Sequence, residues 1–280
     1  MSVSFRTDIA DEVFRSTAGA DCRGLSYEEC TVGGFAVARL AVTSGEGEAM
    51  LGKPMGHYCS LRLDGLLNRS SVMFSGAAEV LSGEIRRLMP NSFSSVTVVG
   101  LGNPDITPDA LGSLAAASVI ATRHLKDADP ADFASMRNVS VLRPGVLGTS
   151  GIESSVQIRA ICGEIKPDAV IVIDALAAAE TSSLCRKIQV SDTGICPGSG
   201  VGNNRAAVNS DALGIPVISV GAATVIDAGV LCSDPAAEKM FVTPRSIDYD
   251  VRLIGRLIGY AVDLALHDGL SVADVDSMIG

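Results

Sequence analysis

The sequence predicts an α/β fold in which helices flank a mostly parallel sheet, with an N-terminal antiparallel elaboration. From about Ser95 onward, short β-branched runs alternate with helical stretches, which is the pattern of βαβ units. Residues 169–173 are entirely apolar, as expected for a strand that is buried on both faces. Residues 35–42 and 58–63 look instead like two paired antiparallel strands.

The parallel part of the sheet is expected to begin with a strand over residues 96–99 and a turn over residues 100–103. Thr107 then suits a helix N-cap, Pro108 the first helical position and Asp109 an acidic first turn. A helix is therefore expected to continue to about residue 122.

The other elements follow from capping and from periodicity. Ser150 and Glu153 have the spacing of a capping box, which predicts a helix running towards Ile165. Apolar residues at a period near 3.6 predict a long last helix over about residues 248–267. The further expectations are a helix over 70–88 and strands over 139–142, 169–173, 187–190 and 215–220.

These elements suggest a division of the chain into three parts. Residues 1–8 are a candidate pro-segment, residues 9–90 an N-terminal elaboration of strands plus a helix, and residues 91–280 an α/β core.

Composition excludes several classes of protein. The chain has 280 residues, 47% of them hydrophobic, which is enough for a sizeable core. Its net charge of −10 argues against a nucleic-acid-binding surface. Its apolar runs are too short to span a membrane, and its N-terminus lacks a secretory signal, so we expect a cytoplasmic protein. The seven cysteines form no C-x-x-C pair, so neither a disulfide framework nor a zinc site is indicated.

Two aspartates are candidate catalytic residues because of their positions after predicted strands. In parallel sheets the working crevice lies at the carboxyl ends of the strands, where Asp109 and Asp174 are expected. A helix N-terminus favours the ionised form of Asp109, whereas burial at the end of a central strand favours the protonated form of Asp174. Such a pair can divide acid and base roles in hydrolysis, although both residues could equally be ordinary helix caps.

Other motifs carry weaker signals. The glycines around Gly100 and those over residues 198–202 lack the spacing of a dinucleotide fingerprint and the lysine of a P-loop. Asp192 opens an Asp-Thr-Gly triplet without the second copy that pepsin-like proteases need, so we interpret it as a loop or supporting residue. None of the three histidines lies in a recognisable nucleophile context.

Several motifs occur in the order found in one known family. They are Val99-Gly100-Leu101-Gly102-Asn103, Thr107-Pro108-Asp109-Ala110-Leu111-Gly112, Thr122-Arg123-His124-Leu125, Pro144-Gly145-Val146, Gly151-Ile152-Glu153, Ile173-Asp174-Ala175-Leu176-Ala177-Ala178 and Pro197-Gly198-Ser199-Gly200-Val201-Gly202-Asn203. In this combination the chain resembles the germination protease (spore protease) family of endospore-forming bacteria. Near the start, Arg6-Thr7-Asp8-Ile9-Ala10 is similar to that family's self-processing segment.

The resemblance implies an atypical aspartic endopeptidase, made as a self-processing zymogen and similar in fold to hydrogenase maturation proteases. It implies catalysis by Asp109 and Asp174. We infer self-processing between Asp8 and Ile9, and we expect no bound metal or other cofactor. We expect Asn103, Glu153 and Asp192 to support the site. Cys196 stands where the resemblance implies a histidine, so no histidine is carried over.

The resemblance also implies the partners. The expected substrates are the small acid-soluble spore proteins, degraded during germination in the cytoplasm of the spore core. A homotetramer is expected, with no direct contact to nucleic acid or membrane. Two alternatives stay open: a metal-dependent maturation endopeptidase of the hydrogenase-protease type, with the two aspartates as ligands, and a non-catalytic small-molecule-binding domain.

Overall fold

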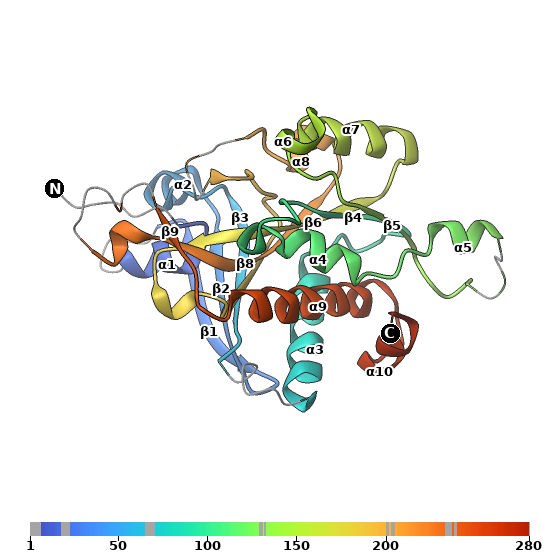
Figure 1. The fold of residues 1–280 in the computed structure, drawn as a ribbon, viewed down its shortest axis with the longest axis horizontal. Helices are drawn as coiled ribbons and strands as arrows, with labels where there is room; N and C mark the ends of the chain where they lie inside the picture. The colour runs from blue at the N-terminus through green and yellow to red at the C-terminus, as the bar shows by residue number, and fades with distance from the viewer. Residues whose placement is uncertain are drawn as a thin grey trace.

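One mixed sheet with helices on both faces forms the centre of the molecule (Figure 1). The computed structural model describes residues 7–17, 23–64, 71–128, 131, 133–199, 202, 205–232, 237 and 240–279. Within these residues the sheet has nine strands, in the order β1-β2-β3-β7-β8-β6-β4-β5, with β9 paired to β8.

The strands are β1 (Leu25–Val32), β2 (Phe35–Val42), β3 (Gly56–Arg62), β4 (Ser95–Gly100), β5 (Asn138–Leu142), β6 (Ala169–Ala178), β7 (Lys187–Ser191), β8 (Val217–Asp227) and β9 (Phe241–Val242). The α-helices are α1 (Ala10–Ser16), α2 (Gly45–Leu51), α3 (Ser71–Leu88), α4 (Leu111–Ala117), α5 (Arg123–Ala128), α6 (Leu147–Ser150), α7 (Ser154–Ile165), α8 (Ser210–Leu213), α9 (Ile247–Leu266) and α10 (Val272–Ile279). Short 3₁₀ turns include η2 (Thr107–Asp109).

The predicted fold class is confirmed. Strands β5, β4, β6 and β8 pair in parallel, as expected for the core. Strands β1, β2 and β3 pair antiparallel and extend the same sheet. Strand β7 joins the two halves and runs antiparallel to both of its neighbours, β3 and β8. The sheet is therefore parallel only in its core.

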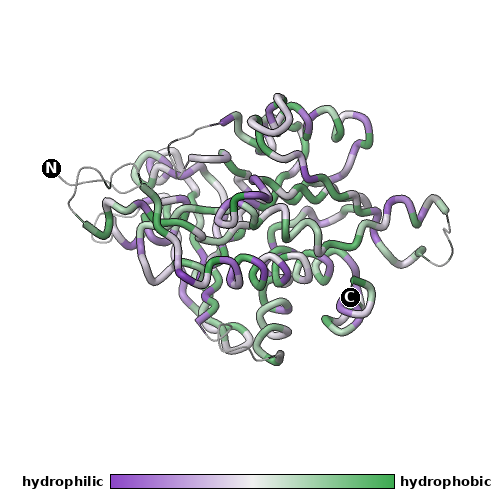
Figure 2. The backbone as a smooth tube through the Cα atoms, viewed as in Figure 1, coloured by the Kyte–Doolittle hydropathy of each residue, from purple (hydrophilic) through white to green (hydrophobic). Residues whose placement is uncertain are grey.

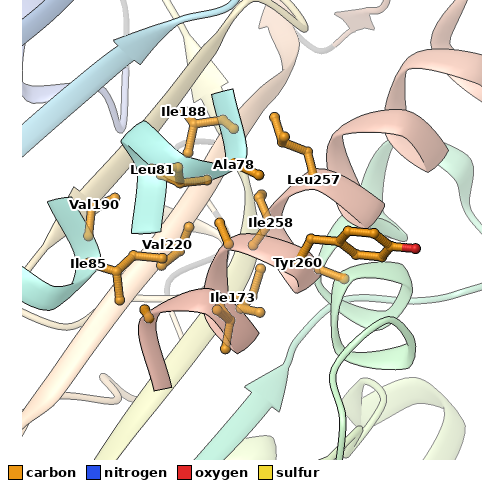
Figure 3. Close-up of a cluster of buried hydrophobic side chains, with 14 of the residues drawn as sticks. Ala78, Leu81, Ile85, Ile173, Ile188, Val190, Val220, Leu257, Ile258 and Tyr260 are labelled. Carbon is orange, nitrogen blue, oxygen red and sulfur yellow. The ribbon is translucent and has the colours of Figure 1, made fainter. Parts of the chain in front are cut away.

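Helices α3, α4 and α9 cover one face of the sheet. Ala78, Leu81 and Ile85 of α3 pack with Leu257 and Ile258 of α9 and with Ile173, Ile188, Val190 and Val220 of the strands (Figure 3). These side chains belong to the largest buried cluster. The tube view shows the strands at the centre as mostly hydrophobic (Figure 2), as a sheet covered on both faces requires.

The opposite face of the sheet has two separate covers. At one end, Ile158 and Cys162 of α7 pack on Val99, Val170 and Val172. At the other end, α1 and α2 pack on β2 and β3 through Ala10, Leu51, Leu40 and Tyr58. Helices α6 and α7 lie across the sheet from α9 (Figure 1). Between the two covers the carboxyl-terminal half of β6 is left to line a cleft.

Four local expectations are wrong. The strand expected over residues 215–220 is β8, which begins at Val217 and continues to Asp227. Strand β6 does not end at Ile173 but continues to Ala178, so Asp174 lies inside it. The helix expected from Thr107 to Thr122 is a 3₁₀ turn followed by the short helix α4, because the chain beyond α4 turns to pair with β5 through Thr122. Ser150 forms no capping box, since it ends α6, and Glu153 is itself the N-cap of α7.

No helix in the described part of the chain is long and apolar enough to cross a membrane.

Candidate active site

The cleft between the two covers holds two adjoining cavities of about 260 and 460 Å³. Both are lined by Asp8, Asp174 and Leu176. The larger cavity is also lined by Asp109. The two predicted carboxylates, 65 positions apart in the chain by their numbering, therefore line one cavity together with a residue of the N-terminal segment.

Asp174 lies in the middle of β6 with only 5% of its surface exposed. Successive side chains of a strand alternate between the faces of the sheet. Ile171 and Ile173 point into the α9 side of the core, so Asp174 points to the cleft side. Its Oδ1 accepts a hydrogen bond from the Ala175 N–H at 2.9 Å.

The pKa of Asp174 is raised well above its ordinary value, first because burial removes water from the carboxylate and second because the negative charge of Asp109 is near. The charge of Asp8 acts in the same direction, and the Ala175 N–H opposes it. Asp174 is therefore the carboxyl group that favours its protonated form, as the sequence predicts.

Asp109 ends the 3₁₀ turn η2 after β4. Its Oδ2 accepts a hydrogen bond of 2.7 Å from the Asn103 N–H, which holds the carboxylate against the loop that follows β4. Gly102 makes this approach possible: its φ is +94°, and a Cβ there would lie 1.9 Å from the Asp109 carbonyl oxygen. The expected link between Asn103 and the site thus runs through the Asn103 backbone.

The environment of Asp109 differs from the expectation of a group ionised by a helix N-terminus. Helix α4 begins only at Leu111, and burial raises the pKa of Asp109. The Asn103 N–H and the positive charge of Arg205 oppose that rise. The pKa values of Asp109 and Asp174 are therefore both raised, but Asp109 has partners that stabilise its ionised form.

The other two residues that were expected to support the site, Glu153 and Asp192, lie in different places. The Glu153 side chain does not cap α7. Its Oε1 lies 3.5 Å from Nη1 of Arg205 in an ion pair, and Arg205 is the residue whose charge acts on Asp109. Asp192 lines neither cavity; it accepts hydrogen bonds from the N–H and the Nδ1 of His57, each at 2.7 Å. Asp192 therefore links the residue after β7 to His57 of β3.

The N-terminal segment lies in the cleft with Asp8 at its centre. The Asp8 N–H donates to the Ala177 carbonyl and the Ala177 N–H donates to Asp8 Oδ2, both at 2.9 Å. Ser199 Oγ donates to Asp8 Oδ1 at 2.8 Å. Ile9 is fully buried against Leu176 and its neighbours. Arg6, Gly200, Val201 and Asn203, which belong to the motifs noted above, lie outside the described residues.

Sequence reasoning missed three residues that hold this segment. Lys53 Nζ donates to the Thr7 carbonyl at 2.9 Å. Ser199 lies in a motif noted for its glycines, but its hydroxyl contact could not be foreseen. Gln189 was detectable as the one polar side chain in the run Ile188-Gln189-Val190, which marks it as facing away from the apolar core. Among the described residues, no group of three or more His, Cys, Asp or Glu side chains is arranged to hold a metal ion.

Several known proteins are similar to this chain. The family model described as germination protease matches residues 7–237. A germination protease from Caldanaerobacter subterraneus subsp. tengcongensis is 34% identical over 99% of this chain and 98% of its own. One from Bacillus subtilis (strain 168) is 37% identical over 90% of this chain and 68% of its own. A crystal structure of the [NiFe] hydrogenase maturation protease HycI from Thermococcus kodakarensis aligns with a TM-score of 0.38 and 16% identity, over 64% of this chain and 98% of that one.

The fold and the cleft define an α/β protein with an acidic cleft at the carboxyl ends of its parallel strands. With a matching family model over most of its length, it is a peptidase, a hydrolase of peptide bonds. The chain belongs to the germination protease family.

Proposed function

We propose that this chain is an aspartic-type endopeptidase, made as a self-processing zymogen, that degrades small acid-soluble spore proteins during germination. The observation that carries the proposal is the cavity that Asp109 and Asp174 line together, with Asp8 of the chain's own N-terminus beside them. The family membership supports the substrate class.

In the proposed mechanism, Asp109 is the general base and Asp174 the general acid. A water molecule gives a proton to Asp109 while its oxygen bonds to the carbonyl carbon of the peptide. The carbonyl oxygen receives the proton of Asp174. When the C–N bond breaks, the nitrogen takes the proton from Asp109, and one hydroxyl proton returns to Asp174. The products are a new carboxyl group and a new amine, and both aspartates regain their starting states.

The roles follow from the environments of the two groups. A general acid must hold its proton near neutral pH, and the raised pKa of Asp174 supports this, mainly through burial. A general base must be ionised, and Arg205 and the Asn103 N–H favour the carboxylate of Asp109. A bond at Asp8–Ile9 fits the same cleft, because Asp8 lines both cavities.

Residues 1–8 are then the pro-segment that self-processing removes, and Asp8 occupies the cleft until the segment has been cut and has dissociated. The rest of the proposal is supported by the family alone: a homotetramer in the cytoplasm of the spore core. The family membership does not favour the metal-dependent or the non-catalytic alternative.

The test is the mass of the full-length chain after incubation under mildly acidic, dehydrating conditions. We expect the parent to lose residues 1–8, and Asp109→Asn and Asp174→Asn to stay intact. Asp105→Asn is the matched control, because Asp105 is exposed on the same loop and lines neither cavity. Processing of both variants at the parental rate would contradict the assignment.

A further inference from the structure

Gln189 lies in the same row of the sheet as Asp174. In the strand register, Gln189 of β7 is opposite Gly221 of β8, and Gly221 is opposite Asp174 of β6. Residues directly opposite each other point to the same face of a sheet. The two polar side chains therefore flank Gly221 on the cleft side, and both line the smaller cavity.

No side chain separates them because the middle position is glycine. A Cβ on Gly221 would lie 2.6 Å from Leu176 Cγ and 2.8 Å from the Asp174 carbonyl oxygen. The row thus needs glycine at its centre, and no side chain stands between Gln189 and Asp174 on the cleft face of the sheet.

The amide of Gln189 contacts the N-terminal segment with both of its ends. Its Nε2 donates to the Asp8 carbonyl oxygen at 3.1 Å, and its Oε1 accepts from the Ala10 N–H at 2.7 Å. This orientation is the one the chemistry requires, since a carbonyl oxygen only accepts and a backbone N–H only donates. Gln189 is 8% exposed, so water competes little for these contacts.

The Asp8 carbonyl belongs to the Asp8–Ile9 peptide bond, which the proposed function assigns as the self-processing bond. When water adds to that carbonyl carbon, an electron pair of the C=O bond moves onto the oxygen. A fixed N–H donor at this oxygen is the arrangement that stabilises such a developing charge. The second contact, to Ala10, aligns the residues on either side of the bond.

We propose that Gln189 is a further catalytic residue of this peptidase, the side-chain donor that stabilises the negative charge on the carbonyl oxygen of the scissile bond. This inference rests on the proposed function. Gln189 takes no part in proton transfer. The carbonyl oxygen that it binds receives its proton from Asp174, and the C–N bond breaks as described above.

A binding role and a catalytic role make different predictions. An interaction that is equally strong with substrate and with the transition state changes KM, whereas one that strengthens in the transition state changes kcat. Ser199 offers the matched control. Its hydroxyl contacts the same residue, Asp8, but at the side-chain Oδ1 and not at the reacting carbonyl.

The experiment uses the self-processed enzyme and a synthetic peptide with the sequence of residues 3–16 of this chain. Three variants are compared with the parent: Gln189→Glu, Gln189→Met and Ser199→Ala. Gln189→Glu keeps an acceptor for the Ala10 N–H but loses the donor, and Gln189→Met loses both. Because loss of Gln189 could impair self-processing, each variant is also produced directly without residues 1–8, and its unfolding midpoint is measured.

We expect both Gln189 variants to lower kcat by about 100- to 1000-fold with KM changed by less than about threefold. Ser199→Ala is expected to raise KM and to change kcat far less. A kcat within about threefold of the parent in Gln189→Met, or a loss that falls on KM alone, would overturn the inference. If Asp109→Asn and Asp174→Asn also cleave the peptide at the parental rate, the proposed function is wrong. If those two variants are inactive but the Gln189 variants cleave normally, only the role proposed for Gln189 is wrong.

Discussion

The side chains of Lys187 and Asp11 form an ion pair that is almost completely removed from solvent. Lys187 Nζ lies 2.9 Å from Asp11 Oδ2, and the two side chains are 1% and 3% exposed. Ser60 Oγ donates to the other carboxylate oxygen. This pair joins helix α1, directly after the proposed self-processing bond, to strand β7.

Breaking this pair on one side is expected to destabilise the protein. Lys187→Met removes the buried counter-ion of Asp11 and leaves its carboxylate with Ser60 and with the more distant Arg15, 3.6 Å away and partly exposed. Removing one partner of a buried ion pair costs about 3–5 kcal/mol in comparable sites. The double variant Lys187→Met with Asp11→Leu has no uncompensated charge, so we expect it to recover most of that loss. Urea unfolding of the parent and both variants measures the difference. A single variant as stable as the parent would contradict the prediction.

The second prediction concerns Asp263, which is fully buried on α9 and accepts a hydrogen bond from the Ile120 N–H at 3.0 Å. Burial raises the pKa of Asp263 to about 8. Between its ordinary value of 3.8 and about 8, the folded state therefore holds a proton that the unfolded state has released. This retained proton stabilises the folded state fully below the ordinary pKa of 3.8, and the stabilisation is lost as the pH rises through about 8.

Asp263→Asn keeps the acceptor for Ile120 and does not titrate. We expect the free energy of unfolding of the parent to fall relative to this variant by roughly 1 kcal/mol per pH unit between pH 4 and 8. Unfolding curves of both proteins at four pH values test this. Parallel pH profiles would show that Asp263 does not have the raised pKa.

The third prediction concerns Arg205, whose charge lowers the pKa of Asp109 against the larger effect of burial. Arg205→Gln should raise the pKa of Asp109, so a higher pH is needed to ionise the proposed base. We expect the acid limb of the kcat/KM profile to move to higher pH, while the basic limb stays in place. Glu153→Gln breaks the ion pair with Arg205 but keeps the arginine charge, so it should not raise the acid limb.

The fourth prediction concerns the loop that holds Asp109. Gly102→Ala places a Cβ 1.9 Å from the Asp109 carbonyl oxygen at a φ of +94°, so the loop must move and Asp109 with it. We expect self-processing to slow by at least about 100-fold, since small misplacements of a catalytic group have effects of this size. Gly148→Ala is the control, because nothing lies within 4 Å of a Cβ there. Equal processing rates in both variants would contradict the prediction.

Local pattern predicted much of the core. The apolar run from Ala169 to Ile173 identified the central strand, and the position of Asp174 after it indicated the cleft. The extension of β6 to Ala178 was missed, because its last residues are small and pair with β8 only in the folded sheet. Helix α1 was missed for a similar reason: it is short, and Ala10 and Ile9 are buried by residues far along the chain.

The contacts of the cleft depend on pairings that no local pattern specifies. Gln189 is opposite Gly221 because β7 pairs antiparallel with β8, and β7 also pairs antiparallel with β3 on its other side. The raised pKa of Asp109 likewise comes from burial in the assembled cleft, which outweighs the effect expected from the local helix start. The periodicity of a sequence indicates which side of one helix or strand is buried. It does not indicate which other elements pack against that side.

The ion pair between Asp11 and Lys187 lies beyond the Asp8–Ile9 bond, on the part of the chain that the proposed cleavage would retain. Cutting that bond would separate Thr7 and Asp8 from the rest of the chain without breaking their own hydrogen bonds, and it would leave α1 tethered to β7 through Asp11. Severing the chain and vacating the site are consequently two distinct events. A reduced mass of the protein by itself reports only that the chain has been cut. Cleavage of an added peptide reports that the site has also been vacated.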